Sequence, residues 1–246
     1  MRLSAGLFHD LFKEWVRIRR QYRKSPLNVE SKDMATLVGG GKLRPGAVQE
    51  ALSLAPQLFA ADGGADAILA LGLTPRAVIG DMDSISEQAR AAFGPVLVTV
   101  AEQDTTDFEK CLLRIDAPVV IAVGFTGGRL DHQFAVMNAL ARHSHRYVVL
   151  LGSEDCAMVV PAGGIGVALS AGTRVSLLPL AAAECSATGL RWPVDGCRLA
   201  PDGLVSVSNE ATGPVSVSAS GPVLISLPRS ELRLLVDAAQ AAVRAG

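Results

Sequence analysis

Two carboxylates one residue apart follow a short apolar run in the first half of the chain. Asp81 and Asp83 flank Met82 just after residues 77–79, with Gly80 between. Mg²⁺ prefers oxygen ligands, so two closely spaced carboxylates at the end of a strand can hold or flank one ion. Asp also favours turns, and an ordinary turn after a strand explains the same pair. By itself, the pair leaves both interpretations open.

A second polar segment, residues 103–110, opens an expected helix. Asp104 is placed to cap this helix, and Asp107 falls in its first turn, where an acid interacts favourably with the helix dipole. The functional interpretation puts Asp107 on a metal ion, while Thr106 and the free N–H groups of the first turn face a phosphate. Lys110, one turn further on, is then placed to neutralise phosphate charge. A well-capped helix without a ligand remains the alternative.

A glycine-rich segment, residues 124–132, lies between an apolar run and an expected helix at 134–141. Its glycines permit close approach of the backbone to a ligand, and Arg129 offers a two-pronged contact to phosphate. A tight turn from strand to helix accounts for the glycines as well. Residues 62–66 and 39–42 are weaker signals of the same kind, and neither has the spacing of a Walker A loop.

Short apolar runs are expected to bring these segments to one edge of a sheet. From residue 35 the runs alternate with helix-like stretches, which predicts a largely parallel sheet with helices on both faces, an α/β/α domain. Most of the runs are followed by Gly or Asp, and ligands of open α/β sheets bind outside the carboxyl ends of the strands. The expected strands are 35–38, 58–61, 77–79, 96–100, 119–123 and 147–151.

The pattern changes after about residue 161. Alternating Val and Ser at 205–208 and 215–218 have the period of half-buried antiparallel strands, which predicts an all-β, sandwich-like domain. An apolar stripe over 231–244 predicts a packed closing helix with Ser230 as its N-cap. The predicted domains are a basic amphipathic extension (1–33), an α/β domain (34–160) and the β domain with its helix (161–246). The expected β strands are 174–178, 204–208, 214–219 and 223–227.

Composition narrows the classes of function. The net charge of −1 over 246 residues provides no basic field for nucleic acid. Glycines and a proline interrupt the longest uncharged run, so no membrane span is expected. Four cysteines without C-x-x-C spacing indicate neither a zinc site nor a disulfide framework. The basic amphipathic helix expected at 7–23 lacks the apolar h-region of a secretory signal, so we expect a cytoplasmic protein. Met34 is an alternative start of the biological chain.

Taken in order, the polar segments resemble the motif series of thiamine pyrophosphokinases. The likeness covers about residues 35–228 and implies transfer of a diphosphate from ATP to the hydroxyethyl oxygen of thiamine, with release of AMP. The segments that carry it are Ala-Asp-Gly-Gly-Ala-Asp (61–66), Gly-Asp-Met-Asp-Ser (80–84), Gln-Asp-Thr-Thr-Asp-Phe-Glu-Lys (103–110), Gly-Gly-Arg-Leu-Asp-His (127–132), Ser-Leu-Leu-Pro-Leu (176–180), Thr-Gly-Leu-Arg-Trp (188–192) and Ser-Asn-Glu (208–210).

The resemblance also implies roles for single residues. The Mg²⁺ ligands would be Asp81, Asp83 and Asp107, and Asp131 would complete the catalytic set. The thiamine pocket would form between the α/β domain of one subunit and the β domain of the other in a homodimer. An indole face suits a cationic thiazolium, although a sandwich also buries tryptophan in its core. The residues implied for ATP are Asp62, Gly63, Gln103, Thr106, Lys110, Arg129 and Asp131; those for thiamine are Trp192, Ser208 and Asn209.

Three other functions compete with this one. A pyrophosphokinase for another alcohol, such as a hydroxymethylpterin, would keep the acidic segments but has no need of residues 188–192 and 208–210. A phosphohydrolase built on an Asp-x-Asp site would need its aspartyl nucleophile at the end of the first strand, whereas the pair here follows the third; a glycosyltransferase belongs to the same class. A non-catalytic sensor of thiamine or nucleotide would not need the complete set of acids.

Overall fold

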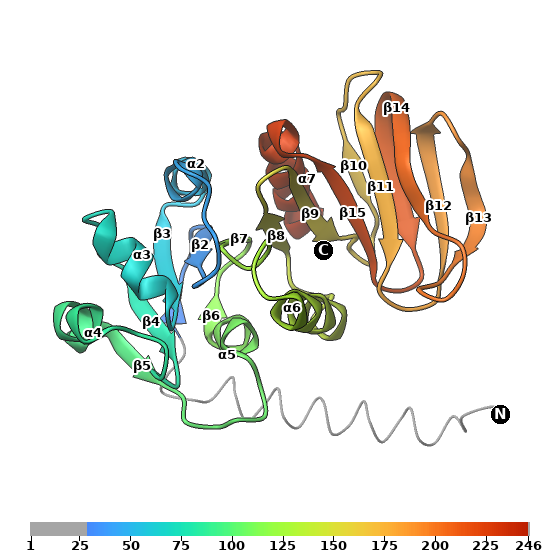
Figure 1. Ribbon diagram of the computed structural model, residues 1–246. Coiled ribbons are helices and arrows are strands. Elements are labelled where there is room, and N and C mark those ends of the chain that lie inside the picture. The colour runs from blue at the N-terminus through green and yellow to red at the C-terminus, as the bar shows by residue number, and fades with distance from the viewer. Residues whose placement is uncertain (1–28, 246) are drawn as a thin grey trace.

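The computed structural model describes residues 29–245 (Figure 1). The helix expected at 7–23 lies outside this range. The last residues of the predicted extension, 29–33, lie within this range. They include β1 (Val29–Glu30), which pairs in parallel with β6 (Ile115–Asp116). Within 29–245, no helix is both long enough and apolar enough to cross a bilayer.

A parallel sheet forms the first half of the fold, as predicted. Its six strands run in the order β8-β7-β2-β3-β4-β5, and every neighbouring pair is parallel. The strand expected at 96–100 begins one residue later than predicted, because Val96 belongs to a short 3₁₀ turn, η1 (Gly94–Val96). The strands are β2 (Ala35–Val38), β3 (Gln57–Ala61), β4 (Ala77–Gly80), β5 (Leu97–Thr99), β7 (Val120–Val123) and β8 (Val148–Leu151).

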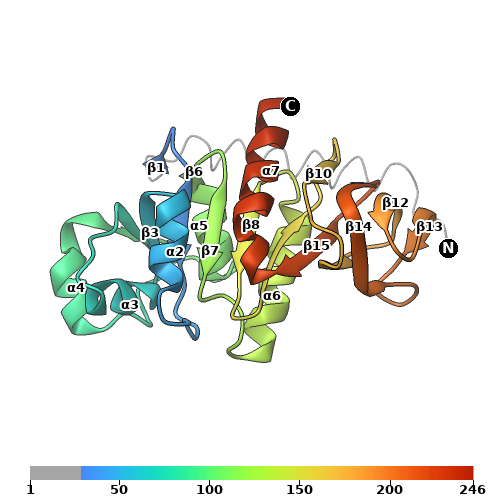
Figure 2. The same ribbon diagram turned by 90° about the horizontal axis from the view of Figure 1, so that it is seen from above.

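Helices cover both faces of this sheet, which confirms the α/β/α prediction. Successive strand residues point to opposite faces, so Leu37 and Val38 enter two different apolar clusters. One cluster includes α2, α3, α4 and the C-terminal α7, which runs beside β8 in Figure 2 and also contacts β9. The other includes α5 and α6. The helices are α2 (Ala47–Leu54), α3 (Gly64–Ala70), α4 (Glu87–Phe93), α5 (Asp107–Arg114), α6 (Leu130–Arg142) and α7 (Leu232–Ala245).

The β-rich half continues the same hydrogen-bonded sheet. β9 pairs antiparallel with β8, and β15 pairs with β9, so the last strand of the chain returns to the edge of the parallel sheet. From β15 the order runs on through β11, β14 and β12 to β13, with β10 on β14. The strands are β9 (Asp155–Val159), β10 (Ile165–Val167), β11 (Arg174–Pro179), β12 (Ala183–Leu190), β13 (Val194–Leu199), β14 (Ser206–Ala219) and β15 (Val223–Pro228).

Two local predictions in this half are wrong. The strands expected at 204–208 and 214–219 are a single strand, β14, whose first residues pair with β11 and whose later residues pair with β10 and β12. Both periodic segments therefore belong to one long strand. Ser230 does not cap α7, because it lies inside the short 3₁₀ turn η2 (Arg229–Glu231) that precedes the helix.

Candidate functional site

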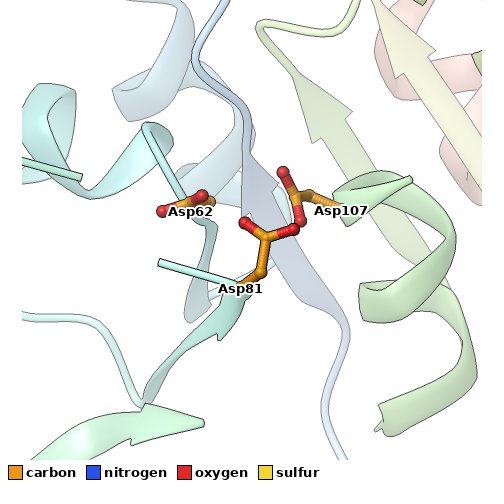
Figure 3. A group of neighbouring side chains, drawn as sticks. All are labelled: Asp62, Asp81 and Asp107. Carbon is orange, nitrogen blue, oxygen red and sulfur yellow. The ribbon is translucent and has the colours of Figure 1, made fainter. Parts of the chain in front are cut away.

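Three carboxylates meet at the carboxyl edge of the parallel sheet. Asp62 follows β3, Asp81 follows β4, and Asp107 is the first residue of α5. One oxygen from each lies within 4.8 Å of the other two, and Figure 3 shows the side chains turned toward one another. Because β3 and β4 are adjacent and parallel, their ends reach the same edge, as expected for a ligand site in an open α/β sheet.

The backbone around Asp81 explains how the carboxylates approach so closely. A Cβ on Gly80 would lie 2.7 Å from the Cβ of Asp62, so only glycine permits this distance between the two strand ends. Met82 adopts a left-handed conformation with φ of 68°, which turns the chain sharply after Asp81. Asp83 lies beyond this turn, is exposed, and accepts a hydrogen bond from Ser84 Oγ at 2.8 Å. It is outside the three-carboxylate group.

Lys110 supplies positive charge to two of the three acids. Its side chain is buried, and its Nζ lies 2.7 Å from Asp81 Oδ2 and 3.2 Å from Asp107 Oδ1. Burial by itself would lower the pKa of Lys110, but the hydrogen bonds to Asp81 and Asp107 outweigh it, so its pKa is raised. The hydrogen bond from Lys110 also lowers the pKa of Asp81. The lysine is therefore cationic and fixed within the cluster.

Asp62 does not share the ion pairs that Lys110 forms with Asp81 and Asp107. Its side chain is 1% exposed, and Oδ2 accepts a hydrogen bond from Ser84 N at 3.2 Å. Its other oxygen, Oδ1, is buried with no hydrogen-bond partner among residues 29–245. Burial, reinforced by the charges of Asp107, Asp81 and Asp83, raises the pKa of Asp62 to about 6.

The cluster fits a hard divalent cation. Three carboxylates face one ammonium group, which leaves excess negative charge, and one buried carboxylate oxygen lacks a partner. Buried polar atoms without partners are rare and mark sites where an ion or water belongs. All the donor atoms are carboxylate oxygens, the ligand type that Mg²⁺ and Ca²⁺ prefer.

The start of α5 differs from the sequence prediction in its cap. Thr106, not Asp104, is the N-cap, and its Oγ1 accepts a hydrogen bond from Glu109 N at 3.4 Å. Asp104 lies in the loop before the helix, too far from its first turn to cap it. The Glu102 carboxylate accepts a hydrogen bond from Asp104 N at 2.8 Å and so folds this loop tightly. Gln103 reaches the cluster through its Nε2, which donates to Asp81 Oδ2 at 3.2 Å. Gln103 and Thr106 thus both border the carboxylates.

Arg129 and Asp131 lie apart from the cluster and pair with each other. Arg129 Nε donates to Asp131 Oδ1 at 3.1 Å and Nη2 to Oδ2 at 2.6 Å. The two side chains are 71% and 64% exposed. The hydrogen bond from Arg129 lowers the pKa of Asp131 to about 2. The pair is thus an exposed ion pair at the start of α6, and Asp131 does not belong to the three-carboxylate group.

Two of the residues predicted for thiamine, Trp192 and Asn209, meet at the turn between β12 and β13. Trp192 is 53% exposed, and its backbone is held by Asn209. The N–H of Trp192 donates to Asn209 Oδ1 at 3.1 Å, and Asn209 Nδ2 donates to the carbonyl of Trp192 at 2.7 Å. Asn209 is buried and so positions the turn, whereas Ser208 is exposed with φ of 57°. The guanidinium of Arg191 lies 5.1 Å from the indole centroid.

This aromatic turn and the carboxylates are far apart within one chain. β12 and β4 are separated by nine steps in the strand order. At about 4.8 Å a step, this places them roughly 40 Å apart. Figure 1 likewise shows β12 and β4 toward opposite ends of the molecule. A small molecule at Asp81 therefore cannot touch Trp192 of the same chain.

A buried ionic group beside the cluster was not predicted. Glu109 is 5% exposed and lies on α5 directly before Lys110. It contacts His143 Nε2 at 2.7 Å and accepts a hydrogen bond from Arg142 Nη1 at 3.0 Å. Both partners lie at the end of α6, so Glu109 ties the first turn of α5 to that helix. The only hint of this contact in the sequence was that Glu109 lies next to the apolar face of α5.

We expect Glu109→Gln to lower the free energy of unfolding by about 1–3 kcal/mol, because Arg142 and His143 would lose their buried ionic partner. Chemical denaturation measures the change. Glu87→Gln on α4 is the matched control, since Glu87 is exposed, and should change stability by less than about 0.5 kcal/mol. Equal stability of the two variants would contradict a fastening role for Glu109.

We expect Asp62→Asn to stabilise the protein in the absence of divalent cations. A carboxyl whose pKa is raised from 3.8 to about 6 by folding makes the native state less stable as pH rises through that window. The advantage of the variant should therefore be absent below about pH 4 and reach about 1–3 kcal/mol above pH 6. Thermal unfolding in a chelator across this range measures it, with exposed Asp83→Asn as control. A constant difference at all pH values would contradict the argument.

Family models match both halves of the chain. The model described as "Thiamin pyrophosphokinase, catalytic domain" matches residues 48–151, which include all three clustered carboxylates. The model described as "Thiamin pyrophosphokinase, vitamin B1 binding domain" matches residues 165–224, which include Trp192 and Asn209.

Curated relatives and solved structures agree with these matches. Thiamine pyrophosphokinase 1 of Oryza sativa subsp. japonica is 32% identical over 155 residues, 55% of this chain and 58% of the rice protein. The chain thus spans less than two thirds of that relative. Thiamine pyrophosphokinase of Bacillus subtilis (strain 168) is 28% identical over 161 residues, 61% and 75% of the two chains. The structure of thiamin pyrophosphokinase from Geobacillus thermodenitrificans superposes with a TM-score of 0.66 at 27% identity, covering 79% of this chain and 96% of that one.

Proposed function

This chain belongs to the thiamin pyrophosphokinase family, and we propose on that premise that it transfers a diphosphate from ATP to the hydroxyethyl oxygen of thiamine, giving thiamine diphosphate and AMP. The observation that carries the proposal is the group of Asp62, Asp81 and Asp107 around Lys110, which lies in the segment that matches the family's catalytic domain. Transfer of phosphoryl groups depends mainly on positioning and on neutralising charge.

The proposed cation is Mg²⁺, held by Asp81 and Asp107 with Asp62 as the third carboxylate. When bound, the ion would neutralise phosphate oxygens and fix their orientation. Lys110 holds Asp81 and Asp107 in place and keeps Asp81 ionised. Asp83 stays a predicted ligand: it neighbours the site, but its carboxylate is turned to Ser84.

ATP is proposed to lie along the same sheet edge. Gln103 and Thr106 border the carboxylates, and Gly63 directly follows Asp62 at the start of α3. The exposed Arg129 is placed to bind phosphate once it leaves Asp131, with which it pairs in the free protein. Asp131 would then be available to a substrate hydroxyl or to the nucleotide, as its predicted catalytic role requires.

Thiamine is proposed to bind at the turn that carries Trp192. The half-exposed indole can stack on the aminopyrimidine or attract the cationic thiazolium. Asn209 fixes the backbone of this turn, and exposed Ser208 lies next to it in the chain. The match of residues 165–224 to a vitamin B1 binding domain supports thiamine over a hydroxymethylpterin as the acceptor.

The two half-sites are proposed to join in a homodimer. The nine strand steps between β4 and β12 prevent one chain from presenting both to one acceptor. A second copy can supply its Trp192 turn to the carboxylates of the first, and the same contact repeated gives a closed, two-fold pair. Exposed apolar side chains in both halves of the chain are available to this interface. They are Leu130 and Phe134 on α6, and Trp192, Leu204 and Val207 in the β half.

Release of AMP from Mg·ATP tests the proposed activity. The purified protein is incubated with thiamine, with a hydroxymethylpterin, or without acceptor, and AMP and thiamine diphosphate are quantified by chromatography. We expect AMP only with thiamine, in amounts equal to the thiamine diphosphate formed. AMP with the pterin alone would overturn the acceptor, and no AMP with any acceptor would overturn the catalytic function in favour of a sensor. A reaction without protein is the control.

A further inference from the structure

Two cysteines lie directly opposite each other on the hairpin formed by β12 and β13. In the antiparallel pairing of these strands, Cys185 is the register partner of Cys197. Side chains of opposed residues in such a pair lie on the same face of the sheet, with Cα atoms about 4.5–5.5 Å apart. Disulfides form at Cα separations of about 4.4–6.8 Å. The backbone therefore already has the spacing that a disulfide needs.

The surroundings of the two thiols differ, and this difference sets which thiol reacts first. Cys185 is 1% exposed and belongs to the apolar core, whereas Cys197 is half-buried and packs against that core from its edge. Burial, with a smaller contribution from the neighbouring Cys197 thiol, raises the pKa of Cys185. Cys197 is thus the thiol that a dissolved reagent meets first, and Cys185 is the neighbour that can react second.

The other two cysteines lack this arrangement. Cys111 and Cys156 are fully buried. Neither has a cysteine as its register partner in the strand pairings. They serve as internal controls for the hairpin pair.

We propose that Cys185 and Cys197 are a redox-active pair that closes to a cross-strand disulfide on reaction with a small-molecule disulfide. The Cys197 thiolate attacks one sulfur of the small disulfide and expels one thiolate. Cys185 transfers its proton to the thiolate expelled in the first step and attacks the Cys197 sulfur of the mixed disulfide, which expels the second thiolate. The two cysteines are oxidised by two electrons in total, and the small disulfide is reduced to two thiols.

The disulfide would restrain the hairpin that ends in the Trp192 turn. Residues 185 and 197 enclose this turn, and cross-linking a short loop removes conformational freedom that the open hairpin has. The pair would thus place the thiamine-binding turn under redox control. This last consequence rests on the proposed function, whereas formation of the disulfide does not.

Treatment of the purified full-length protein with oxidised glutathione tests the proposal. Before any thiol is blocked, we expect an intact mass lower by two hydrogens than that of the reduced protein. After the remaining thiols are blocked, we expect a cross-linked peptide joining Cys185 to Cys197, and dithiothreitol should reverse the reaction fully. Amide hydrogen exchange across residues 183–199 should slow in the oxidised protein. A wild-type protein that keeps a stable glutathione adduct, cross-links between two chains, or does not react at all would overturn the proposal.

Single variants separate the two chemical steps. Cys185→Ala should stop at a stable glutathione adduct on Cys197, and Cys197→Ala should not react. Cys156→Ala, the matched control, should form the disulfide as the wild type does. An internal disulfide in either hairpin variant would contradict the assignment. The wild-type peptide map remains decisive if a variant fails to fold, and none of these measurements depends on the diphosphate transfer activity.

Discussion

Replacing Asp107 by Asn is expected to lower kcat for thiamine-dependent AMP release by at least about a hundredfold, because one of the charged groups that fix the phosphates would be lost. Asp107 contributes one of the three gathered oxygens and is one of two acids that hold Lys110. Steady-state rates at saturating Mg·ATP and thiamine measure the loss. The helix should still form, since its cap is Thr106 and Asn preserves the size of the side chain.

The neighbouring acids make this prediction specific. Asp81→Asn should match Asp107→Asn, because Asp81 belongs to the same group and forms the shorter contact to Lys110. Asp83→Asn should retain much more activity if its exposed carboxylate stays outside the cation site. An equal loss in Asp83→Asn would restore it to the ligand set predicted from the sequence. Near-normal kcat in Asp107→Asn, with an unchanged melting temperature, would remove Asp107 from the site.

Mixing two inactive variants is expected to restore activity. In a dimer whose sites combine the α/β half of one chain with the Trp192 turn of the other, Asp107→Asn and Trp192→Ala damage different halves. A hybrid dimer then contains one site with both defects and one intact site. After unfolding and refolding together in equal amounts, half of the dimers are hybrids, so about a quarter of the wild-type activity should return.

A second mixture provides the matched control. Asp81→Asn and Asp107→Asn both damage the α/β half, so each site of their hybrid contains one defect and no activity should return. Native mass spectrometry verifies that hybrids form in both mixtures. The shared site would be contradicted by confirmed hybrids of Asp107→Asn and Trp192→Ala that stay inactive, and equally by normal thiamine use in Trp192→Ala alone.

The local sequence was sufficient for the strands of the parallel sheet, the class of fold and the edge where the acids gather. Short runs such as 35–38 and 77–79 consist almost entirely of apolar residues, as strands buried on both faces do, and glycines and acids follow at their carboxyl ends. The alternating Val and Ser of 215–218 likewise reported one buried and one exposed face. These properties depend on near neighbours in the chain, so periodicity alone reveals them.

The membership of the carboxylate group was decided by tertiary structure. Asp83 is two residues from Asp81 in sequence, yet the left-handed turn at Met82 directs it away, while Asp62, far earlier in the chain, arrives from the adjacent strand. The contact of Glu109 with His143, and the pairing of Cys185 with Cys197, depend in the same way on helix packing and strand register. Spacing along the chain indicates which edge or face a residue reaches, but the separation of two side chains depends on which strands are neighbours and how each turn bends, and both are properties of the whole fold.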